Sequence, residues 1–265
     1  MEVRDWKKFF IPYEQAVDEL VLKFDTLKRQ FLILEEYSPI EYVQGRVKTI
    51  SSILEKTKRD NISLEEIEEK MEDIAGIRIM CQFVDDIHKV VELMRHRNGK
   101  DLTIIHEKDY IRNKKESGYR SYHIIIRYPI QCALGTKEVM AEIQIRTMAM
   151  NFWATIEHSL NYKYKYDIPE EIHRRLKNSA EASYLLDQEM YEIREEIRDA
   201  QKMFNIRSST ISQILHHIQY LYEIGEEEIS KKYQQIFAEL WEKGDLTMLL
   251  SLEVDLKHMV DRYKK

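Results

Sequence analysis

The sequence predicts an α/β (α+β) protein: a mixed β-sheet of about five strands flanked by helices, with further helices at the C-terminal end. The first observation behind this is a shortage of turn residues, since the 265 residues include only 7 glycines and 4 prolines. So few chain breakers favour long helices and argue against an all-β sandwich or barrel. The second observation is that the spacing of apolar residues changes from helical to alternating and back again along the chain.

The N-terminal part of the chain carries helical patterns. Apolar residues recur at helical spacing over residues 14–37, and the Ser-Pro pair at 38–39 ends that helix. A shorter helical stretch follows Gly45. The serine and glutamate at the ends of segment 63–66 form a capping box, which predicts a helix that ends near Met71.

The middle of the chain carries the strands. Four segments rich in Ile, Val and Tyr are predicted to be extended: residues 77–83, 103–106, 121–128 and 137–146. Between the first two, the apolar spacing from Asp85 to Arg97 predicts a crossover helix, closed by Asn98-Gly99. Helices and strands therefore alternate here, which is typical of a sheet with helices packed on it.

After the last predicted strand the pattern is helical again. An aromatic-rich helix is expected over residues 148–161, and Pro169 opens a long charged helix expected to run to about Gln201. Residues 209–265 predict three further helices, punctuated by Gly225 and by Gly244-Asp245. We therefore expect one domain in residues 1–201 and a helical extension of unknown role in residues 202–265.

Composition narrows the class of protein. The 41 Lys and Arg against 47 Asp and Glu give a net charge of -6. This acidic balance argues against a protein that binds nucleic acid or membranes non-specifically over its whole surface. Cys81 and Cys132 form neither a metal-ligand pair nor a disulfide framework and are expected to be buried, reduced thiols. No apolar run is long enough to span a membrane, and the first residues do not form a signal peptide. A soluble, cytoplasmic protein is expected.

Polar residues alternate with apolar ones along three of the predicted strands. Alternation places them together on one face of the sheet. They are Arg78, Gln82, Ser121, His123, Arg127, Glu142, Gln144 and Arg146. One interpretation is a solvated face, which is common in antiparallel sheets. The other is a polar cleft, since a solvated face usually carries Lys, Thr and Glu at random and not this set of Glu, Gln, Arg and His.

Two segments concentrate basic residues despite the acidic total: residues 46–59 and 108–120. A run of charge on a helix is usually a solvated face, but one segment follows a glycine and the other links two strands. Both suit a polyphosphate, and Asp73 and Glu142 could then hold Mg²⁺, which favours one or two carboxylates plus substrate phosphates. No Walker loop or dinucleotide glycine fingerprint is present. These residues indicate a Mg²⁺-dependent nucleotide enzyme.

Four motifs in the sequence resemble those of a known protein family. They are Gly45-Arg46-Val47-Lys48, Glu72-Asp73-Ile74-Ala75-Gly76-Ile77-Arg78, Gly118-Tyr119-Arg120-Ser121-Tyr122-His123 and Glu142-Ile143-Gln144-Ile145-Arg146-Thr147. Together they resemble the nucleotidyltransferase-like synthetase domain of RelA/SpoT-type alarmone synthetases, over roughly residues 10–200. The stand-alone small alarmone synthetases are similar in also carrying a run like residues 150–158. The hydrolase domain of the long family members is missing, so the chain is expected to make alarmone and not degrade it.

The resemblance implies a GTP diphosphokinase that acts in stringent-response signalling. Such an enzyme transfers the β,γ-diphosphate of ATP to the 3′-hydroxyl of GTP or GDP, giving (p)ppGpp and AMP. Asp73 and Glu142 would hold Mg²⁺, and Glu142 would also orient or deprotonate the attacking hydroxyl.

The resemblance also implies the nucleotide-binding residues. Arg46 and Arg78 would clamp the adenine of ATP, and Tyr119 would stack on guanine. The expected ATP-binding residues are Arg46, Lys48, Lys56, Arg59 and Arg78, and the expected GTP-binding residues are Lys115, Tyr119, His123, Gln144 and Asn151.

Small family members are similar in forming homotetramers through their flanking helices and in being stimulated by their alarmone product, so both are expected here. Residues 202–265 depart from the compact family pattern and are expected to contact an oligomer mate or a partner. Two alternatives stay open. The same transfer could act on another 3′-hydroxyl, at a tRNA end or on an adenine nucleotide, or the chain could be a non-catalytic regulator that binds alarmone or RNA.

Overall fold

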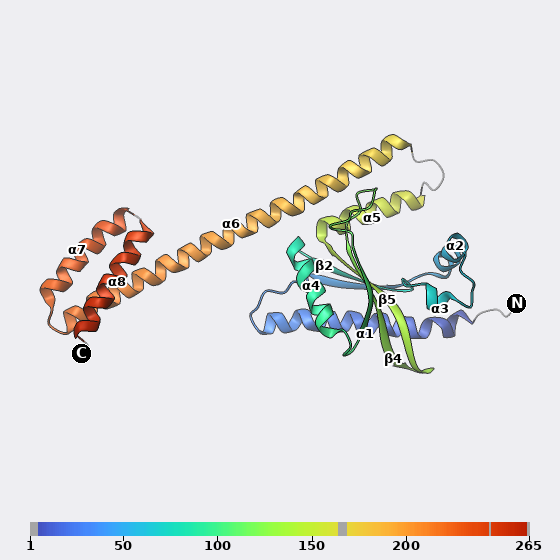
Figure 1. The fold of residues 1–265 in the computed structure, drawn as a ribbon, viewed down its shortest axis with the longest axis horizontal. Coiled ribbons are helices and arrows are strands. Elements are labelled where there is room, and N and C mark those ends of the chain that lie inside the picture. The colour runs from blue at the N-terminus through green and yellow to red at the C-terminus, as the bar shows by residue number, and fades with distance from the viewer. Residues whose placement is uncertain (1–4, 164–168, 244, 264–265) are drawn as a thin grey trace. The chain divides into compact units, whose positions relative to one another are not determined.

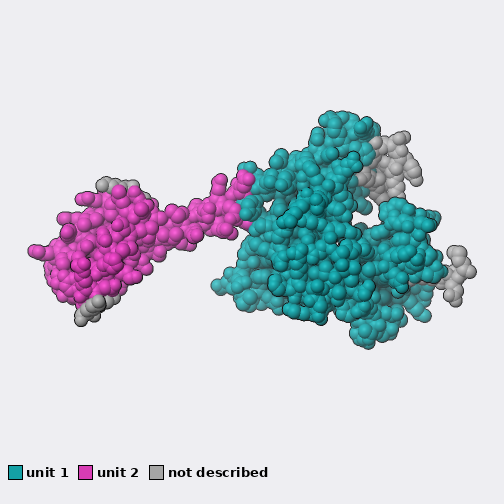
Figure 2. Space-filling view, in the orientation of Figure 1, with its two compact units in different colours: residues 1–191 teal, residues 192–265 magenta. Residues whose placement is uncertain are grey.

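The computed structural model describes residues 5–163, 169–243 and 245–263 (Figure 1). Residues 1–191 and 192–265 form two compact units (Figure 2). Within the described ranges, no helix combines the length and the apolar character that crossing a membrane requires.

The first unit is built on one mixed five-stranded sheet, which confirms the predicted fold class. Its strands are β1 (Tyr42–Val47), β2 (Ala75–Cys81), β3 (Thr103–Asp109), β4 (Tyr122–Cys132) and β5 (Gly135–Thr147). They lie in the order β1-β2-β5-β4-β3. Only β2 and β5 pair in parallel; the other neighbours are antiparallel. The two central strands therefore come from segments far apart in the sequence.

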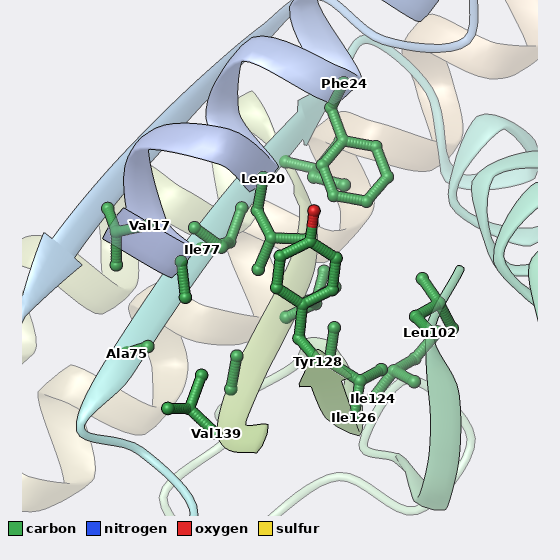
Figure 3. Packing of buried hydrophobic residues seen from close by; sticks show 14 of the residues in the cluster. Val17, Leu20, Phe24, Ala75, Ile77, Leu102, Ile124, Ile126, Tyr128 and Val139 are labelled. Atoms are coloured by element: carbon green, nitrogen blue, oxygen red, sulfur yellow. The ribbon is translucent and has the colours of Figure 1, made fainter. Parts of the chain in front are cut away.

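One face of this sheet is the hydrophobic core. Helix α1 (Trp6–Ile33) lies along it, and α4 (Val84–Arg97) contributes its apolar side chains to the same cluster. Figure 3 shows Leu20 and Phe24 of α1 packed over Ile77 of β2 and over the apolar side chains of β4. Since both helices cover the apolar face, the alternate residues of each strand point to the opposite face.

Gly45 allows α1 to approach the edge strand β1. A Cβ atom at this position would lie 2.4 Å from a methyl carbon of Val17 and 2.7 Å from one of Val21, both on α1. Real Cβ atoms do not approach that closely, so a larger residue would push the helix away from the strand. Gly45 therefore has a packing role beneath the first helix.

Several predicted boundaries were wrong. The first helix starts at Trp6, well before Glu14, and continues through Pro12. Strand β1 was not predicted, and the helix after it is α2 (Ile50–Asp60). Helix α3 (Ile67–Lys70) is a single turn, although the Glu66 carboxylate does accept a hydrogen bond from the Ser63 amide (3.2 Å).

The long charged helix does not end at Gln201. Helix α5 (Met148–Lys163) is followed by α6 (Glu170–Glu223), which runs unbroken through the predicted domain boundary at 201/202. No glycine or proline occurs in this 54-residue helix, so nothing stops it before Gly225, which has a φ of 92°.

The second unit is a small helical bundle. It contains the C-terminal part of α6 together with α7 (Glu227–Lys243) and α8 (Leu246–Tyr263). These helices share a separate apolar core, to which α6 contributes Ile214 and Leu221 and α8 contributes Leu249 and Leu256. The helical character predicted for this stretch is confirmed, with two helices after α6.

Asp187 of α6 is a buried carboxyl group in the first unit. It is 5% exposed and accepts a hydrogen bond from the Thr147 hydroxyl (2.6 Å), whose oxygen in turn accepts one from the Met150 amide at the start of α5 (3.1 Å). Burial raises the pKa of Asp187 to about 6, although the Thr147 hydrogen bond and the charge of Arg120 oppose this rise. A carboxyl group in an unfolded chain has a pKa of about 3.9.

The raised pKa of Asp187 predicts a pH-dependent effect of Asp187→Asn on stability. Because the folded state binds the extra proton, the contribution of Asp187 to the free energy of unfolding falls as pH rises from about 4 to about 6. Asparagine keeps an oxygen for Thr147 and carries no charge. We expect the substitution to raise the free energy of unfolding by about 1–2 kcal/mol at neutral pH, and the gain to vanish below about pH 4.

Urea unfolding at neutral pH and below about pH 4 measures how much the substitution changes the free energy of unfolding at each pH. Asp199→Asn, at an exposed position of the same helix, should change the free energy of unfolding by less than about 0.5 kcal/mol. A stabilisation by Asp187→Asn that is equal at both pH values would contradict the prediction.

Candidate active site

The polar face predicted from alternation forms on the central strands. Glu142 of β5 lies opposite Gly76 of β2, and Gln144 lies opposite Arg78 in the same parallel pairing. On the other side of β5, Gln144 lies opposite His123 of β4. Side chains from three strands therefore meet on the face that α1 and α4 leave uncovered.

Asp73 lies just before β2, at the edge of this face. Its two carboxylate oxygens accept hydrogen bonds from Lys48 (2.7 Å) and Lys56 (2.8 Å). The Lys48 amide also donates to the Ile74 carbonyl (2.8 Å), which extends the pairing of β1 with β2 up to Asp73. Burial acts to raise the pKa of Asp73, but the two lysines outweigh it, so the pKa lies below its usual value. Asp73 is therefore an ionised carboxylate between two ammonium groups.

Glu142 is held at both carboxylate oxygens. One lies 2.8 Å from Nδ1 of His123, and the other accepts a hydrogen bond from the Gln144 amide group (2.8 Å). Burial acts to raise the pKa of Glu142, but His123 and Gln144 lower it below its usual value; the negative charge of Asp73 acts in the opposite direction. Asp73 is therefore near enough to affect the pKa of Glu142, which stays an ionised carboxylate.

Arginines gather beside these carboxylates. The Arg46 side chain lies over Gly76, where even a Cβ atom would touch it at 3.6 Å. The Arg78 guanidinium donates a long hydrogen bond to the Gln144 side-chain oxygen (3.4 Å). Burial, and then the charges of Arg146 and Arg46, lower the pKa of Arg78. Three guanidinium groups crowded in this way form a strong site for an anion.

Tyr119 lies at the other end of the face. Its ring centroid is 6.5 Å from that of Trp153 and 5.1 Å from the Lys115 ammonium. Its hydroxyl lies 2.8 Å from Nε2 of His123 and accepts a hydrogen bond from Arg146 (2.5 Å). Burial is the main reason why the pKa of Tyr119 is raised. The ring is thus held in place by polar groups at its hydroxyl and by cations and aromatic rings around it.

Asn151 and Arg59, two other residues of the predicted site, lie in different surroundings. The side-chain oxygen of Asn151, on α5, is buried and has no hydrogen-bond partner within the described part of the chain. A bound ligand that donates a hydrogen bond would remove that cost. Arg59 points elsewhere: its side chain is 72% exposed and bonds the neighbouring Asp60 carboxylate (2.7 Å).

Two arginines that the sequence left without a role are buried. Arg146 is 4% exposed and lies among Tyr119, Gln144 and Ser121. Arg120 is 6% exposed and bonds Glu181 of α6 (2.9 Å), which ties the loop before β4 to that helix. Arg146 alternates in register with Glu142 and Gln144, so its position on the polar face was visible in the sequence; the burial of Arg120 was not.

The donor set fits a divalent metal that is completed by substrate. No group of three or more His, Cys, Asp and Glu side chains with metal-binding placement occurs among the described residues. Two ionised carboxylates are present instead: Asp73 just before β2 and Glu142 on the neighbouring strand β5. Mg²⁺ is commonly held in this way, by one or two carboxylates plus the phosphates of a nucleotide.

A mixed sheet that gathers carboxylates, arginines and lysines on one face defines a nucleotide-dependent phosphotransferase. The family described as "Region found in RelA / SpoT proteins" matches residues 45–167. GTP pyrophosphokinase YjbM of Bacillus subtilis is 54% identical over 205 residues, which are 77% of this chain and 96% of YjbM. The chain therefore belongs to the RelA/SpoT family, as the four motifs predicted.

Solved structures agree with this assignment. Small alarmone synthetase 1 of B. subtilis bound to its product pppGpp is 54% identical, with a TM-score of 0.69 over 74% of this chain and 99% of that chain. The same enzyme bound to AMPCPP is 49% identical, with a TM-score of 0.64 over 74% of this chain and 100% of that chain. About a quarter of this chain lies outside each match, whereas the relatives are matched almost completely.

Proposed function

We propose that this chain is a GTP diphosphokinase that uses ATP and GTP or GDP to make (p)ppGpp and AMP. The observation that carries the proposal is the placement of Asp73, just before β2, and of Glu142, on the neighbouring strand β5, among arginines and lysines. The 54% identity to a GTP pyrophosphokinase, over nearly its whole length, supports the same reaction. So do the pppGpp and AMPCPP bound to similar enzymes.

In the proposed reaction the ribose 3′-oxygen of the acceptor attacks the β-phosphorus of ATP. The bond from that phosphorus to the α-phosphate oxygen breaks, and AMP leaves with the electron pair. Glu142 receives the hydroxyl proton or orients the hydroxyl for attack. Mg²⁺ held by Asp73 and Glu142 would neutralise charge on the donor phosphates. The low pKa of Glu142 keeps the carboxylate ionised and able to accept a hydrogen bond from the hydroxyl.

The donor ATP is proposed to bind at the β1–β2 edge. Arg46 and Arg78 would enclose the adenine, since guanidinium planes stack on aromatic bases. Lys48 and Lys56 would neutralise the triphosphate, and Arg59 would join them only by leaving Asp60. Both lysines bond Asp73 in this structure, so they stand beside the carboxylate that would share its metal with those phosphates.

The acceptor guanine nucleotide is proposed to bind near Tyr119, with the base stacked on its ring. Lys115 and His123 would contact the acceptor phosphates, and Gln144 and Asn151 the ribose or base. The unpartnered oxygen of Asn151 supports this role. Both ring nitrogens of His123 bond within the protein without nucleotide, so a phosphate contact by His123 requires acceptor binding to break its bond to Tyr119 and to place a proton on Nε2.

The direct test is to mix the protein with ATP, GTP and Mg²⁺ and separate the products. We expect AMP and a guanine nucleotide with a 3′-diphosphate in equal amounts. Competition with an adenine nucleotide and with tRNA measures acceptor choice. Transfer to either in preference to GTP and GDP would replace the proposed acceptor. Absence of any transfer would favour the remaining alternative, a non-catalytic regulator that binds alarmone or RNA.

We further propose that the enzyme is a cytoplasmic homotetramer that binds its alarmone product as a regulator. Support for assembly comes from an apolar hollow of about 980 Å³ between α5 and α6. It is lined in part by Phe152, Ile156, Leu186 and Met190, and Phe152 is 68% exposed. A second copy covering this hollow would remove apolar surface from water, and light scattering would measure the resulting mass.

A further inference from the structure

Five side chains on the polar face close a ring of hydrogen bonds. Starting from Glu142, the ring passes through His123 (2.8 Å) to Tyr119 (2.8 Å) and from there to Arg146 (2.5 Å). It then returns from Arg146 through Gln144 (2.7 Å) to Glu142 (2.8 Å). Arg146 and Glu142 thus lie at opposite ends, joined by two branches.

The chemistry of Arg146 and of Glu142, at the two ends of the ring, fixes the direction of both branches. A guanidinium group donates hydrogen bonds and cannot accept them. One nitrogen, Nη2, donates to the Tyr119 hydroxyl oxygen and to the side-chain oxygen of Gln144. The Gln144 amide must therefore present its oxygen to Arg146 and its NH₂ group to Glu142, which is the orientation found.

The same reasoning applies along the other branch. The ionised Glu142 can only accept a hydrogen bond, so a neutral His123 carries its proton on Nδ1 and donates it to Glu142. The bare Nε2 of His123 then accepts from the Tyr119 O–H, whose oxygen in turn accepts from Arg146. Every bond in the ring points away from Arg146 and toward Glu142.

Arg146 is itself rigidly held. It is 4% exposed, its Nε donates to the Ser121 hydroxyl (3.2 Å), and its guanidinium carbon lies 5.1 Å from the Tyr119 ring centroid. The guanidinium therefore fixes the ring proposed to stack on guanine as well as the amide and imidazole that hold the proposed base. A change at Arg146 would reach both ends of the acceptor site.

We propose that Arg146 is the positioning residue of the active site, which holds the Tyr119 hydroxyl against the imidazole of His123, orients Gln144 and so aligns Glu142 with the acceptor bound at Tyr119. The role in turnover rests on the proposed function. The tautomer of His123 does not, because it is a property of the protein without nucleotide.

The tautomer is tested by NMR of the free protein labelled with ¹⁵N in its 9 histidines. The His123 resonances are those missing from the spectrum of His123→Gln. We expect a protonated Nδ1 and a bare Nε2 in the wild type. A proton on Nε2 with a bare Nδ1 in the wild type would overturn the inference, whatever the activity of the protein.

The effect on turnover is tested with Arg146→Lys, which keeps the charge and loses the planar fork. We expect kcat to fall by about 10- to 100-fold and the KM for the guanine nucleotide to rise, with the KM for ATP within about twofold of wild type. Tyr119→Phe keeps the aromatic ring but loses the hydroxyl. In the double variant with Arg146→Lys, the losses of kcat should not multiply, because both changes break the same branch, the one through Tyr119 and His123. Multiplying losses, or wild-type kinetics in folded Arg146→Lys, would refute the positioning role.

Arg95→Lys is the matched control. Arg95 also donates to a tyrosine hydroxyl, that of Tyr122 (3.2 Å), and to a side-chain acceptor, the carboxylate of Glu107 (2.6 Å), but it lies outside the ring. We expect its kinetics to stay within about twofold of wild type. If wild-type protein makes no alarmone while the Nδ1–H tautomer is found, the proposed function fails and the assignment of the ring remains.

Discussion

Glu142→Gln should lower turnover at least about 100-fold while the protein stays folded, since general acid–base help contributes about 10²- to 10⁴-fold. Glutamine keeps the size of the side chain but can neither take a proton nor offer two anionic oxygens to His123 and Gln144. The loss should appear in kcat, measured as AMP formed at saturating ATP and GTP. Melting curves would confirm that the fold is kept.

Glu138→Gln provides the comparison. Glu138 lies on the same strand and its side chain is 61% exposed, so the same chemical change there should leave turnover within about twofold. Near-normal turnover in folded Glu142→Gln would remove Glu142 from the reaction. Because the pKa of Glu142 is lowered in the fold, its ionised form persists at acidic pH. Activity that depends on this form should be lost only as pH falls below the usual glutamate value of about 4.3.

Asp73→Asn should have a similarly large effect for a different reason. The change removes the negative charge that lies between Lys48 and Lys56, and with it one of the two carboxylates proposed to hold Mg²⁺. A metal contributes several kcal/mol of charge stabilisation, so a loss of about 100-fold or more in kcat/KM is expected. Binding of Mn²⁺ in the presence of a non-hydrolysable ATP analogue, followed by electron paramagnetic resonance, should weaken in parallel.

Asp101→Asn is a suitable control for that measurement. Asp101 is likewise a carboxylate held by two cations, Lys23 (2.8 Å) and Arg97, but it belongs to the segment between α4 and β3. Its substitution should leave Mn²⁺ binding unchanged. Unchanged binding in Asp73→Asn as well would show that the ion is held without this carboxylate.

The fold and the polar face could largely be predicted because they follow from periodicity. Alternation along β2, β4 and β5 placed Arg78, His123, Glu142 and Gln144 on one face, and pairing in register then brought them together. Strand β1 was missed because it is short and has a glycine, Gly45, in place of an apolar side chain beneath α1. Gly45 is required because α1 packs closely on the strand at this position, and that contact is seen only in the folded chain.

The partners of individual side chains could not be predicted. Nothing in the spacing of residues shows that Lys48 and Lys56 both bond Asp73, because this depends on how α2 follows β1. The burial of Arg120 depends on α6, a helix from a distant part of the sequence. The length of α6 was misjudged because a stop was placed at Gln201, where the sequence has no breaker.

The parallel pairing of β2 with β5 determines which changes of chain length the enzyme can tolerate. Asp73 lies just before β2 and Glu142 lies on its parallel neighbour β5, while residues 98–102 and 133–134 connect other elements between them. Insertions at those two connections would leave the two carboxylates in place. Deleting one residue inside β5, before Glu142, would exchange the two sides of that strand and bury the glutamate against Leu20. Evolution is therefore free to lengthen these two connections but not to shift the central strand by one residue.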